Sequence, residues 1–432
     1  MRDSRPNIVF IIADDHRHDA IHALGDAQVK TPNLDKLADS GTALTNTYIM
    51  GSTVGAVCMP SRGMMLTGRT LWKIDEPDLG EWPLWPQTLR EAGYHTHGIG
   101  KWHNERKSFA KCFADGAEIF FGGMSDHHKV PIHDYDPEGH FPEEDVRVGQ
   151  GFSTDIFARA ATDFLQQYSG EKPFCLYVAF TAPHDPRTPP DVFAYNPDEL
   201  ELPNNFLARH PFDNGELDVR DELLAPYPRT QGVIRQHLAD YYGMISHLDS
   251  AIGKILKALE ATGVSENTLV IYTADHGLAV GQHGLLGKQN LYEHSIKVPF
   301  LIRGPQIPAN NRSDAFCYLY DLGATLCDAL NLPIPVSVEG RSFWETVLNG
   351  KAHRNIVCSA FKHKHRSIRE EGYKLIEYHL GDATRRQMFD LVSDPLEVHN
   401  LLEAGQKHHK LPALQHKLKQ WQLSVGDPLA DQ

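Results

Sequence analysis

The stretch Asn7-Ile-Val-Phe-Ile-Ile-Ala13, followed at once by Asp14-Asp15, determines how the rest of this 432-residue chain can fold. It is a short, unbroken and largely β-branched apolar run, which is typical of a strand buried on both faces. Two later segments repeat this design, Lys172-Pro-Phe-Cys-Leu-Tyr-Val-Ala-Phe180 before Thr181-Ala-Pro-His184, and Thr268-Leu-Val-Ile-Tyr-Thr-Ala274 before Asp275-His276-Gly277. The sequence therefore predicts three buried strands with polar residues at their carboxyl ends, where open parallel sheets place their sites.

Two amphipathic helices are predicted around these strands. Residues 153–168 carry apolar side chains at helical spacing behind a Ser/Thr cap, and residues 232–262 do so over a longer span that stops at Gly263. Strands that alternate with helices indicate an α/β fold. We expect a doubly wound, mixed but mainly parallel sheet that is flanked by helices.

The rest of the chain shows other patterns. Residues 122–150 and 183–230 are rich in Gly, His, Asp or Pro without periodicity, so we expect long ordered loops that shape a pocket. After about residue 350 the pattern changes to short strands and a final helix, near 355–361, 373–379, 387–391 and 408–423. We therefore expect a large α/β domain over 1–350 and a small C-terminal subdomain, an antiparallel sheet with a helix, over 351–432.

Composition limits the classes of function. The chain is 41% hydrophobic and 23% charged, and no segment approaches the ~20 apolar residues that span a bilayer, so we expect a soluble protein with no membrane partner. Its net charge of −14 argues against a nucleic-acid partner, and an anionic substrate would need a locally positive pocket. No signal-type apolar stretch precedes the first strand, which leaves the compartment open between the cytoplasm and a periplasmic or secreted protein with a trimmed signal.

The six cysteines show no CxxC pair and no disulfide framework, so most of them are expected to be buried thiols. Cys58 has a distinctive context, because Pro60 suits the first turn of a helix. Cys58 should then lie near a helix N-terminus, where free N–H groups attract anions. From its immediate surroundings alone, both an inert thiol and a reactive group stay open.

Asp14 and Asp15 end one predicted strand, and Asp275 and His276 end another. Carboxylates that converge at one sheet edge repel each other unless a cation lies among them, and mostly oxygen ligands suit Ca²⁺ or Mg²⁺. The alternative is that each pair caps the helix that follows it. Their equivalent positions at two strand ends favour the metal.

Cys58-Met-Pro-Ser-Arg62, which continues to Leu66-Thr-Gly-Arg69, resembles the signature of the type I, formylglycine-dependent sulfatases of the alkaline-phosphatase superfamily. The resemblance extends over nearly the whole chain, through Pro6-Asn-Ile-Val-Phe, Gly100-Lys-Trp-His103, Ala182-Pro-His184, Thr273-Ala-Asp-His-Gly277, Gly287-Lys288 and Phe389-Asp-Leu391. In that family a separate maturation enzyme oxidises the cysteine to an aldehyde, which hydrates to a diol. One hydroxyl attacks sulfur and expels the alcohol, and the other then ejects sulfate and restores the aldehyde.

The resemblance implies a divalent cation, usually Ca²⁺ with Mg²⁺ as the alternative, held by Asp14, Asp15, Asp275 and His276. Some relatives carry Asn where this chain has His276. The ion would contact the diol and a sulfate oxygen, lowering the pKa of the diol and neutralising charge on the substrate. Arg62 would hydrogen-bond the diol as a permanent cation.

Four further residues receive roles from the resemblance. Lys101 and Lys288 would bind sulfate oxygens whose charge grows during transfer. His103 would help to remove the diol proton, while His184, together with Lys288, would protonate the leaving alkoxide. Taken singly, each of these residues has an ordinary surface role as its alternative.

The predicted loops supply candidate substrate contacts, namely His127, His128, His133, Asp134 and Arg187. Each could hydrogen-bond a sugar hydroxyl or a carboxylate, and each has an exposed polar loop as the alternative. The segments Ala-Pro-His-Asp-Pro-Arg187 and Gln282-His-Gly-Leu-Leu-Gly-Lys288 are similar to those of bacterial sulfatases that act on sulfated carbohydrates. This similarity implies a sulfated sugar, oligosaccharide or polysaccharide fragment as substrate.

Two other functions stay open at this level. Phosphonate monoester and phosphodiester hydrolases share the formylglycine and metal site. A chain whose Cys58 is not converted would instead be a non-catalytic anion- or glycan-binding protein.

Overall fold

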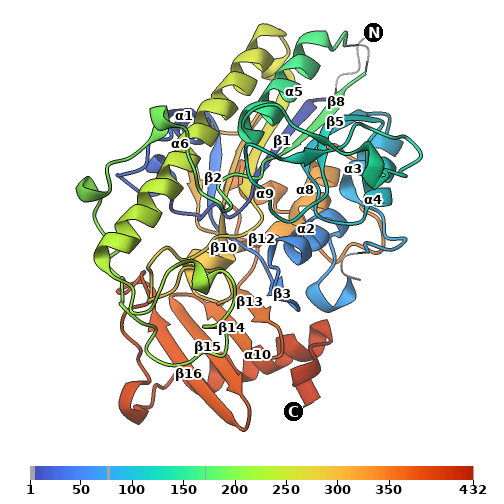
Figure 1. Ribbon diagram of the computed structural model, residues 1–432. Helices are drawn as coiled ribbons and strands as arrows, with labels where there is room; N and C mark the ends of the chain where they lie inside the picture. Colours follow the sequence, from blue (N-terminus) through green and yellow to red (C-terminus); the bar gives the residue numbers. More distant parts are fainter. Residues whose placement is uncertain (1–4, 75–77, 171, 432) are drawn as a thin grey trace.

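The computed structural model describes residues 5–74, 78–170 and 172–431 (Figure 1). Its main layer is a nine-stranded sheet in the order β11-β2-β10-β9-β1-β8-β4-β5, with β12 paired to β2. The three predicted strands are β1 (Asn7–Ala13), β8 (Phe174–Ala179) and β9 (Thr268–Ala274), and all of their residues are buried. β1 pairs in parallel with both β8 and β9, so the prediction is confirmed and the three carboxyl ends lie at one edge.

The remaining strands make the sheet mixed, as predicted. They are β2 (Thr42–Tyr48), β4 (His95–Lys101), β5 (Asp115–Phe120), β10 (Lys297–Arg303), β11 (Asn311–Ser313) and β12 (Cys317–Tyr318). β10 runs antiparallel to β9 and β2, and the other pairings in this sheet are parallel. All six cysteines are free and buried, in agreement with the expected thiols.

Helices flank the sheet in two groups (Figure 1). One group contains α1 (Pro32–Asp39), α5 (Ser153–Gln167) and α6 (Gln231–Ala261). The other contains α2 (Cys58–Thr67), α3 (Trp85–Glu91), α4 (Arg106–Cys112), α8 (Leu322–Ala329) and α9 (Trp344–Asn349). The two predicted helices, α5 and α6, begin and end within a residue of their expected limits. The doubly wound α/β class is therefore confirmed.

A second sheet forms the C-terminal part, in the order β16-β15-β14-β13-β3. Its strands are β3 (Gly51–Ser52), β13 (Ile356–Phe361), β14 (His365–Glu370), β15 (Tyr373–Leu380) and β16 (Ala383–Asp390), and α10 (Leu411–Val425) contacts it. β14 was missed, because its six residues are largely polar. A Cβ on Gly51 would lie 1.9 Å from the carbonyl oxygen of Ala360, so the strand that joins this sheet ahead of Cys58 accepts only glycine there. The boundary near residue 350 stays a prediction.

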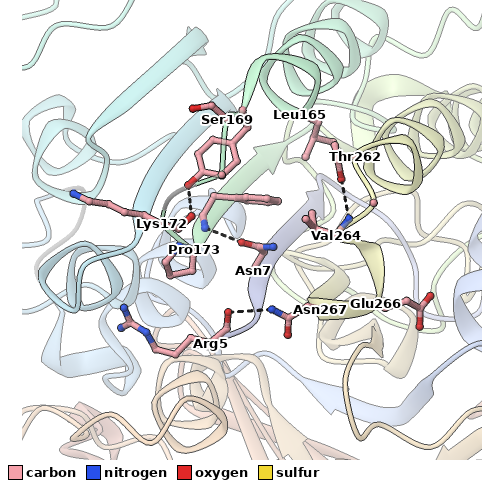
Figure 2. Close-up of a pocket in the computed structure, with 14 residues that line it drawn as sticks. Arg5, Asn7, Leu165, Ser169, Lys172, Pro173, Thr262, Val264, Glu266 and Asn267 are labelled. Atoms are coloured by element: carbon pink, nitrogen blue, oxygen red, sulfur yellow. Dashed lines mark hydrogen bonds between the residues drawn. The ribbon is translucent and has the colours of Figure 1, made fainter. Parts of the chain in front are cut away.

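The two regions expected to be loops contain only short elements in their described residues. These are β6 (Pro131–Ile132) and β7 (Arg147–Val148) with a few 3₁₀ turns. At the amino-terminal ends of β1 and β8, a pocket lined by Arg5, Asn7 and Pro173 faces away from the acidic strand ends (Figure 2). None of the helices in the described part of the chain has the length and apolar character that crossing a bilayer requires.

Candidate active site

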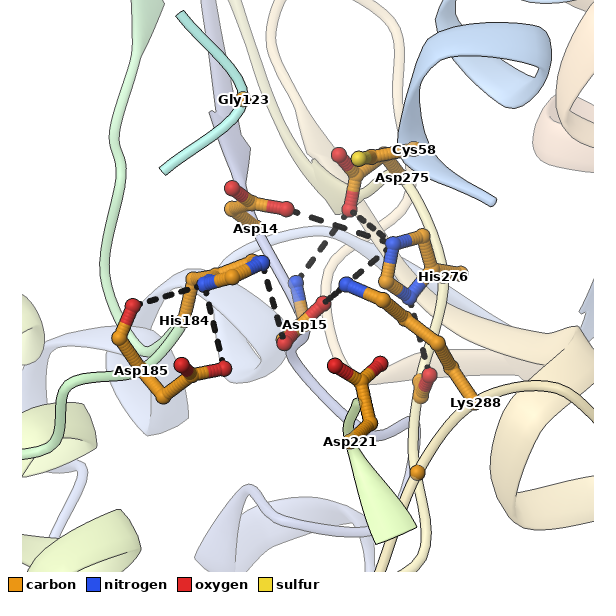
Figure 3. A network of polar contacts seen from close by, with 12 residues as sticks. Asp14, Asp15, Cys58, Gly123, His184, Asp185, Asp221, Asp275, His276 and Lys288 are labelled. Atoms are coloured by element: carbon orange, nitrogen blue, oxygen red, sulfur yellow. Dashed lines mark hydrogen bonds and ion pairs between the residues drawn. The ribbon is translucent and has the colours of Figure 1, made fainter. Parts of the chain in front are cut away.

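Two pairs of predicted metal ligands meet at the carboxyl edge of the main sheet (Figure 3). Asp14 and Asp15 follow β1, and Asp275 and His276 follow β9, whose last residue is in register with the last residue of β1. The backbone N–H of Asp15 donates to Asp275 Oδ1 at 3.3 Å. All four side chains are buried. Parallel pairing of two buried strands is what brings the four together.

Nε2 of His276 faces the carboxylates of Asp14, Asp15 and Asp275 (Figure 3). Its Nε2 lies 3.3 Å from Asp15 Oδ1, 3.6 Å from Asp275 Oδ1 and 4.0 Å from Asp14 Oδ1. Its Nδ1 lies 2.9 Å from the carbonyl of Gly277, so Nδ1 donates there and Nε2 faces the carboxylates. Among the residues that the structure describes, neither His276 Nε2 nor Asp14 Oδ1 has a hydrogen-bond partner.

The electrostatics of His276 show what this cluster attracts. Burial by itself lowers the pKa of His276, but the carboxylate of Asp275, with that of Asp15, overrides it and raises the pKa to about 9. The cluster therefore draws positive charge, which a proton or a cation can supply. Asp14, Cys58, Asp275 and His276 each offer one ligand atom within 4.8 Å of the others. Asp15 belongs to a second such group, with Asp14 and His184. Carboxylates with one imidazole fit a divalent cation, and the two unpartnered atoms fit it as ligands.

Cys58 is the first residue of α2, as the sequence predicted, and it faces this cluster. Its Sγ lies 3.2 Å from His103 Nδ1 and 3.9 Å from Lys101 Nζ. Burial raises the pKa of the thiol, but the charges of Lys101 and Lys288 outweigh burial and lower the pKa below its ordinary value. The unpaired N–H groups of the first helical turn also favour negative charge at this position.

Arg62 lies one turn after Cys58 on α2 and is fully buried. Its Nε donates to Asp275 Oδ2 at 2.8 Å, and its Nη1 donates to the carbonyl of Lys101 at 2.9 Å. Its Nη2 has no hydrogen-bond partner within residues 5–74, 78–170 and 172–431. Arg62 therefore connects α2 to β4 and β9, and one of its donors has no partner among the described residues.

The two predicted lysines are buried and ion-paired, unlike solvated surface lysines. Lys101 Nζ pairs with Asp14 and with the carbonyl of Gly123. Lys288 Nζ donates to Asp15 Oδ1 at 2.8 Å. Burial lowers the pKa of Lys288, but the Asp15 carboxylate reverses this effect and raises the pKa above its ordinary value. The two ammonium groups place positive charge among the buried carboxylates.

The two predicted catalytic histidines are uncharged in the structure near neutral pH. Burial lowers the pKa of His103 to about 2 and holds the pKa of His184 well below its usual range. His184 follows the cis peptide bond between Ala182 and Pro183. Its Nδ1 donates to the Asp185 carbonyl at 2.8 Å, and its Nε2 lies 3.9 Å from Asp15 Oδ2. Both rings are therefore neutral imidazoles, each with one nitrogen that carries a lone pair.

Two of the five expected substrate contacts join this site. Arg187 Nη2 lies 4.0 Å from Asp15 Oδ2, with the guanidinium 5.4 Å from the ring centre of Tyr241. His127 uses both ring nitrogens within the protein, with Nε2 2.9 Å from the His184 carbonyl and Nδ1 2.7 Å from Ser153 Oγ. His127 therefore supports the His184 backbone.

The prediction of a Ser/Thr cap at the start of α5 was wrong. The N-cap is Phe152, which has no capping side chain. The Ser153 hydroxyl bonds His127 and, at 2.9 Å, Thr181 Oγ1. The buried imidazole of His127 needs hydrogen-bond partners because water does not reach it, and the Ser153 hydroxyl is one of them.

The other three expected contacts lie elsewhere in the described part of the chain. His128 is exposed beside Phe152, and the ring of His133 is buried 5.2 Å from that of Phe121. Asp134 is exposed and accepts from Arg147 at 2.9 Å. The structure records no contact between these three and the Cys58 cluster, within the residues it describes, and their role in substrate binding stays a prediction.

A further polar chain beside His184 was not predicted. Asp185 Oδ1 lies 3.4 Å from His184 Nδ1, and its other oxygen pairs with Arg220. Arg220 also donates to Asp221 Oδ1 at 2.7 Å, and Asp221 Oδ2 accepts from Gln289 Nε2 at 2.8 Å. Gln289 follows Lys288, so the chain links both sides of the site. Asp185 could have been noticed as the neighbour of His184, whereas Arg220 and Asp221 lie in an aperiodic loop without a motif.

Comparison with known proteins gives the same result as this geometry. The family model described as Sulfatase matches residues 6–332, which is well over half of the chain. The chain belongs to the sulfatase family. A second model, described as N-sulphoglucosamine sulphohydrolase, C-terminal, matches residues 281–424 of this sulfatase-family chain.

Individual relatives extend over nearly the whole chain. N-acetylglucosamine-6-O-sulfatase of Bacteroides thetaiotaomicron is 27% identical, over 98% of this chain and 87% of its own length. A solved structure in complex with its substrate D-glucosamine-2-N,6-O-disulfate has a TM-score of 0.81 at 24% identity and 99% coverage of both chains. The phosphonate monoester hydrolase of Agrobacterium radiobacter has a TM-score of 0.75 at 22% identity, over 98% of this chain and 95% of its own. The structural likenesses show a shared fold.

Proposed function

We propose that this chain hydrolyses sulfate esters of a sulfated sugar, through formylglycine made from Cys58 and a divalent cation held by Asp14, Asp15, Asp275 and His276. The observation that carries the proposal is the position of Cys58, buried at the start of α2 and directed at these four residues. Membership of the sulfatase family supports it. The cation that we favour is Ca²⁺, because three of the four protein ligands offer carboxylate oxygen.

The chain's own residues supply most of the chemistry. A bound cation would neutralise sulfate charge and lower the pKa of a hydroxyl on residue 58. Lys101 and Lys288 bring permanent positive charge to either side of that residue, where charge on the sulfate oxygens grows. The free Nη2 of Arg62 can donate to the same residue.

Two neutral histidines can move the protons. His103 Nδ1 is 3.2 Å from Cys58 Sγ, so it can take a proton from a hydroxyl on that residue. His184 lies beside Asp15, on the loop that follows β8. It is proposed to protonate the leaving alkoxide together with Lys288. A sulfate ester brings negative charge, which raises the pKa of His184 and favours this role.

A carbohydrate is the substrate class that we propose for this site. The relative from B. thetaiotaomicron is a sulfatase of N-acetylglucosamine, and the solved neighbour binds a disulfated glucosamine. Of the expected substrate contacts, Arg187 is the one that supports this proposal. Its guanidinium borders Asp15 and can bind a second anionic group of such a sugar.

The experiment is desulfation of a panel of defined sulfated mono- and oligosaccharides by the matured protein. We expect turnover of at least one sugar sulfate and none by a Cys58→Ala variant that folds normally. Peptide mass spectrometry across Cys58 should show a loss of about 18 Da relative to the thiol. Turnover by Cys58→Ala would contradict the nucleophile, and an unconverted Cys58 in protein from a host with the maturation enzyme would favour a non-catalytic binding role.

A phosphonate monoester or phosphodiester hydrolase is the second candidate, because such an enzyme shares this fold with a TM-score of 0.75. Aryl sulfate and aryl phosphonate esters with the same leaving group separate the two functions. We expect a higher kcat/KM for the sulfate. A much higher value for the phosphonate would replace the sulfatase proposal.

A further inference from the structure

A second group of metal-binding side chains lies on β4 and β5, outside the catalytic cluster. His95 and His97 are two positions apart on β4, so they project on the same face of the sheet. Asp115 begins β5 and is in register with His97. Asp115 Oδ2 lies 3.2 Å from His97 Nδ1 and 3.9 Å from His95 Nε2, and one ligand atom of each residue lies within 4.8 Å of the others.

His97 is a buried polar side chain that the protein itself leaves unsatisfied. Its side chain is 8% exposed, and neither ring nitrogen forms a hydrogen bond with any described residue. Nδ1 approaches the Asp115 carboxylate but does not meet it in hydrogen-bonding geometry. A buried imidazole whose ring nitrogens form no hydrogen bond favours a ligand that those nitrogens can bind.

The surroundings prepare the three side chains for a cation. Asp115 Oδ1 accepts from the N–H of Gly116 at 2.7 Å, which leaves Oδ2 to the two imidazoles. The ring of Phe164 stacks on both histidines, 4.5 Å from His97 and 5.9 Å from His95, and holds their orientation. Asp115 is half exposed, so an ion can enter from solvent.

We propose that His95, His97 and Asp115 form a binding site for Zn²⁺, separate from the catalytic cation site. Two imidazoles and one carboxylate suit Zn²⁺, whereas Ca²⁺ and Mg²⁺ prefer oxygen ligands throughout. Ligand atoms around tetrahedral Zn²⁺ lie about 3.3 Å apart, so small side-chain rotations complete the site, with water as the fourth ligand. His97 precedes Lys101 by about 13 Å along β4, which makes this a second ion. The ion would fasten the edge strand β5 to β4.

The test is equilibrium dialysis against Zn²⁺ in the presence of excess Ca²⁺, which occupies the catalytic site. His95→Gln and Asp115→Asn are the variants, because both side chains are partly exposed and their loss leaves the core intact. The matched control is His22→Gln, which alters an exposed histidine that pairs with Asp35 at 3.3 Å. Circular dichroism verifies that all of the proteins are folded.

We expect wild type and His22→Gln to bind one more equivalent of Zn²⁺ than either variant, or to bind it at least tenfold more tightly. Zn²⁺ should raise the Tm of wild type more than that of His95→Gln, since ligands of the native state stabilise it. Co²⁺ should give a visible absorption band in wild type that both variants lose. Equal Zn²⁺ stoichiometry and affinity in wild type and the two folded variants would overturn the proposal, whatever the catalytic activity.

Discussion

At the scale of single residues, buried carboxylates of the site form ion pairs with buried cationic side chains, each with one partner. Three pairs do this, Asp14 with Lys101, Asp15 with Lys288 and Asp275 with Arg62. A buried ion pair is costly to break from one side, because the remaining charge is then unpaired in a medium of low polarity. The pairs therefore hold both the proposed metal ligands and the proposed anion-binding groups in position.

Replacing Lys288 by alanine is predicted to abolish most of the turnover. The change removes positive charge where sulfate charge grows and leaves Asp15 without its ammonium partner. We expect kcat to fall by about 10²–10³. Steady-state kinetics on an aryl sulfate measures kcat, with Lys254→Ala as the control, since Lys254 is exposed and pairs with Asp155 instead of a residue of the site. A change of less than threefold in the Lys288→Ala variant would remove Lys288 from the proposed chemistry.

At the scale of elements, the close contact of β4 with β8 places Lys101. Gly100, the residue before it, has φ +84°, and a Cβ there would lie 2.0 Å from the carbonyl oxygen of Ala179 on β8. Only glycine allows β4 to reach the cluster in this conformation.

The substitution Gly100→Ala is predicted to destabilise the protein and to lower its activity. The methyl group must separate β4 from β8 and shift Lys101, at a cost of about 1–3 kcal/mol or more. Urea unfolding and kcat together measure the effect. Gly232→Ala is the control, since no described atom lies within 4 Å of its added Cβ. Equal free energies of unfolding for Gly100→Ala and Gly232→Ala would show that β4 and β8 can separate without cost, which would contradict the prediction.

The C-terminal helix is tied to the second sheet by a buried ion pair. Arg366 of β14 donates through Nε and Nη2 to Asp427, at 2.5 and 2.6 Å, just after α10 ends. Both side chains are fully buried. Asp427→Asn is predicted to lower the free energy of unfolding by about 3–5 kcal/mol, because it leaves the guanidinium without its counter-charge.

The ion pair between Arg366 and Asp427 also predicts that the free energy of unfolding depends on pH. Burial raises the pKa of Asp427, but the hydrogen bonds and charge of Arg366 outweigh it and hold the pKa below its ordinary value of 3.8. A depressed folded-state pKa stabilises the protein above the unfolded-state pKa, and this contribution is lost as the pH falls through the folded-state value. The stability difference between wild type and Asp427→Asn should therefore be full at pH 6 and shrink below about pH 4. A stability difference between wild type and Asp427→Asn that stays constant from pH 6 to pH 3 would contradict this prediction.

At the scale of the whole molecule, the acidic cluster links separate parts of the chain through one proposed cation. Among the described residues, Asp14 Oδ1 and His276 Nε2 have no hydrogen-bond partner, and the bound cation would be a partner for both. We predict that chelation lowers both Tm and activity and that Ca²⁺ restores both, with Tm rising as the Ca²⁺ concentration rises.

Calorimetry with and without Ca²⁺ checks this expectation. In Asp275→Asn the dependence of Tm on Ca²⁺ should be much weaker, whereas in Asp427→Asn it should match wild type despite the lower stability. A Tm of wild type that does not respond to chelation or to Ca²⁺ would argue against a structural role for the cation.

Local patterns in the sequence determined the frame of this protein. The apolar run of Asn7–Ala13 and its repeats identified three buried strands, because an unbroken β-branched stretch is stable only inside a sheet. Asp14 and Asp275 then had to meet at one edge, since parallel strands end together. Cys58 was located at a helix start from Pro60 two residues later. These features depend on neighbours a few residues away.

Only the tertiary structure decided which polar side chains face the site. His127 binds Ser153 and the His184 carbonyl, and Asp221 binds Gln289, through contacts between segments 26 to 68 residues apart. The strand His365–Glu370 was missed because its stability comes from pairing on both sides and not from its own pattern. The direction of a polar side chain depends on which partners packing brings within hydrogen-bond reach, and no local periodicity encodes those partners.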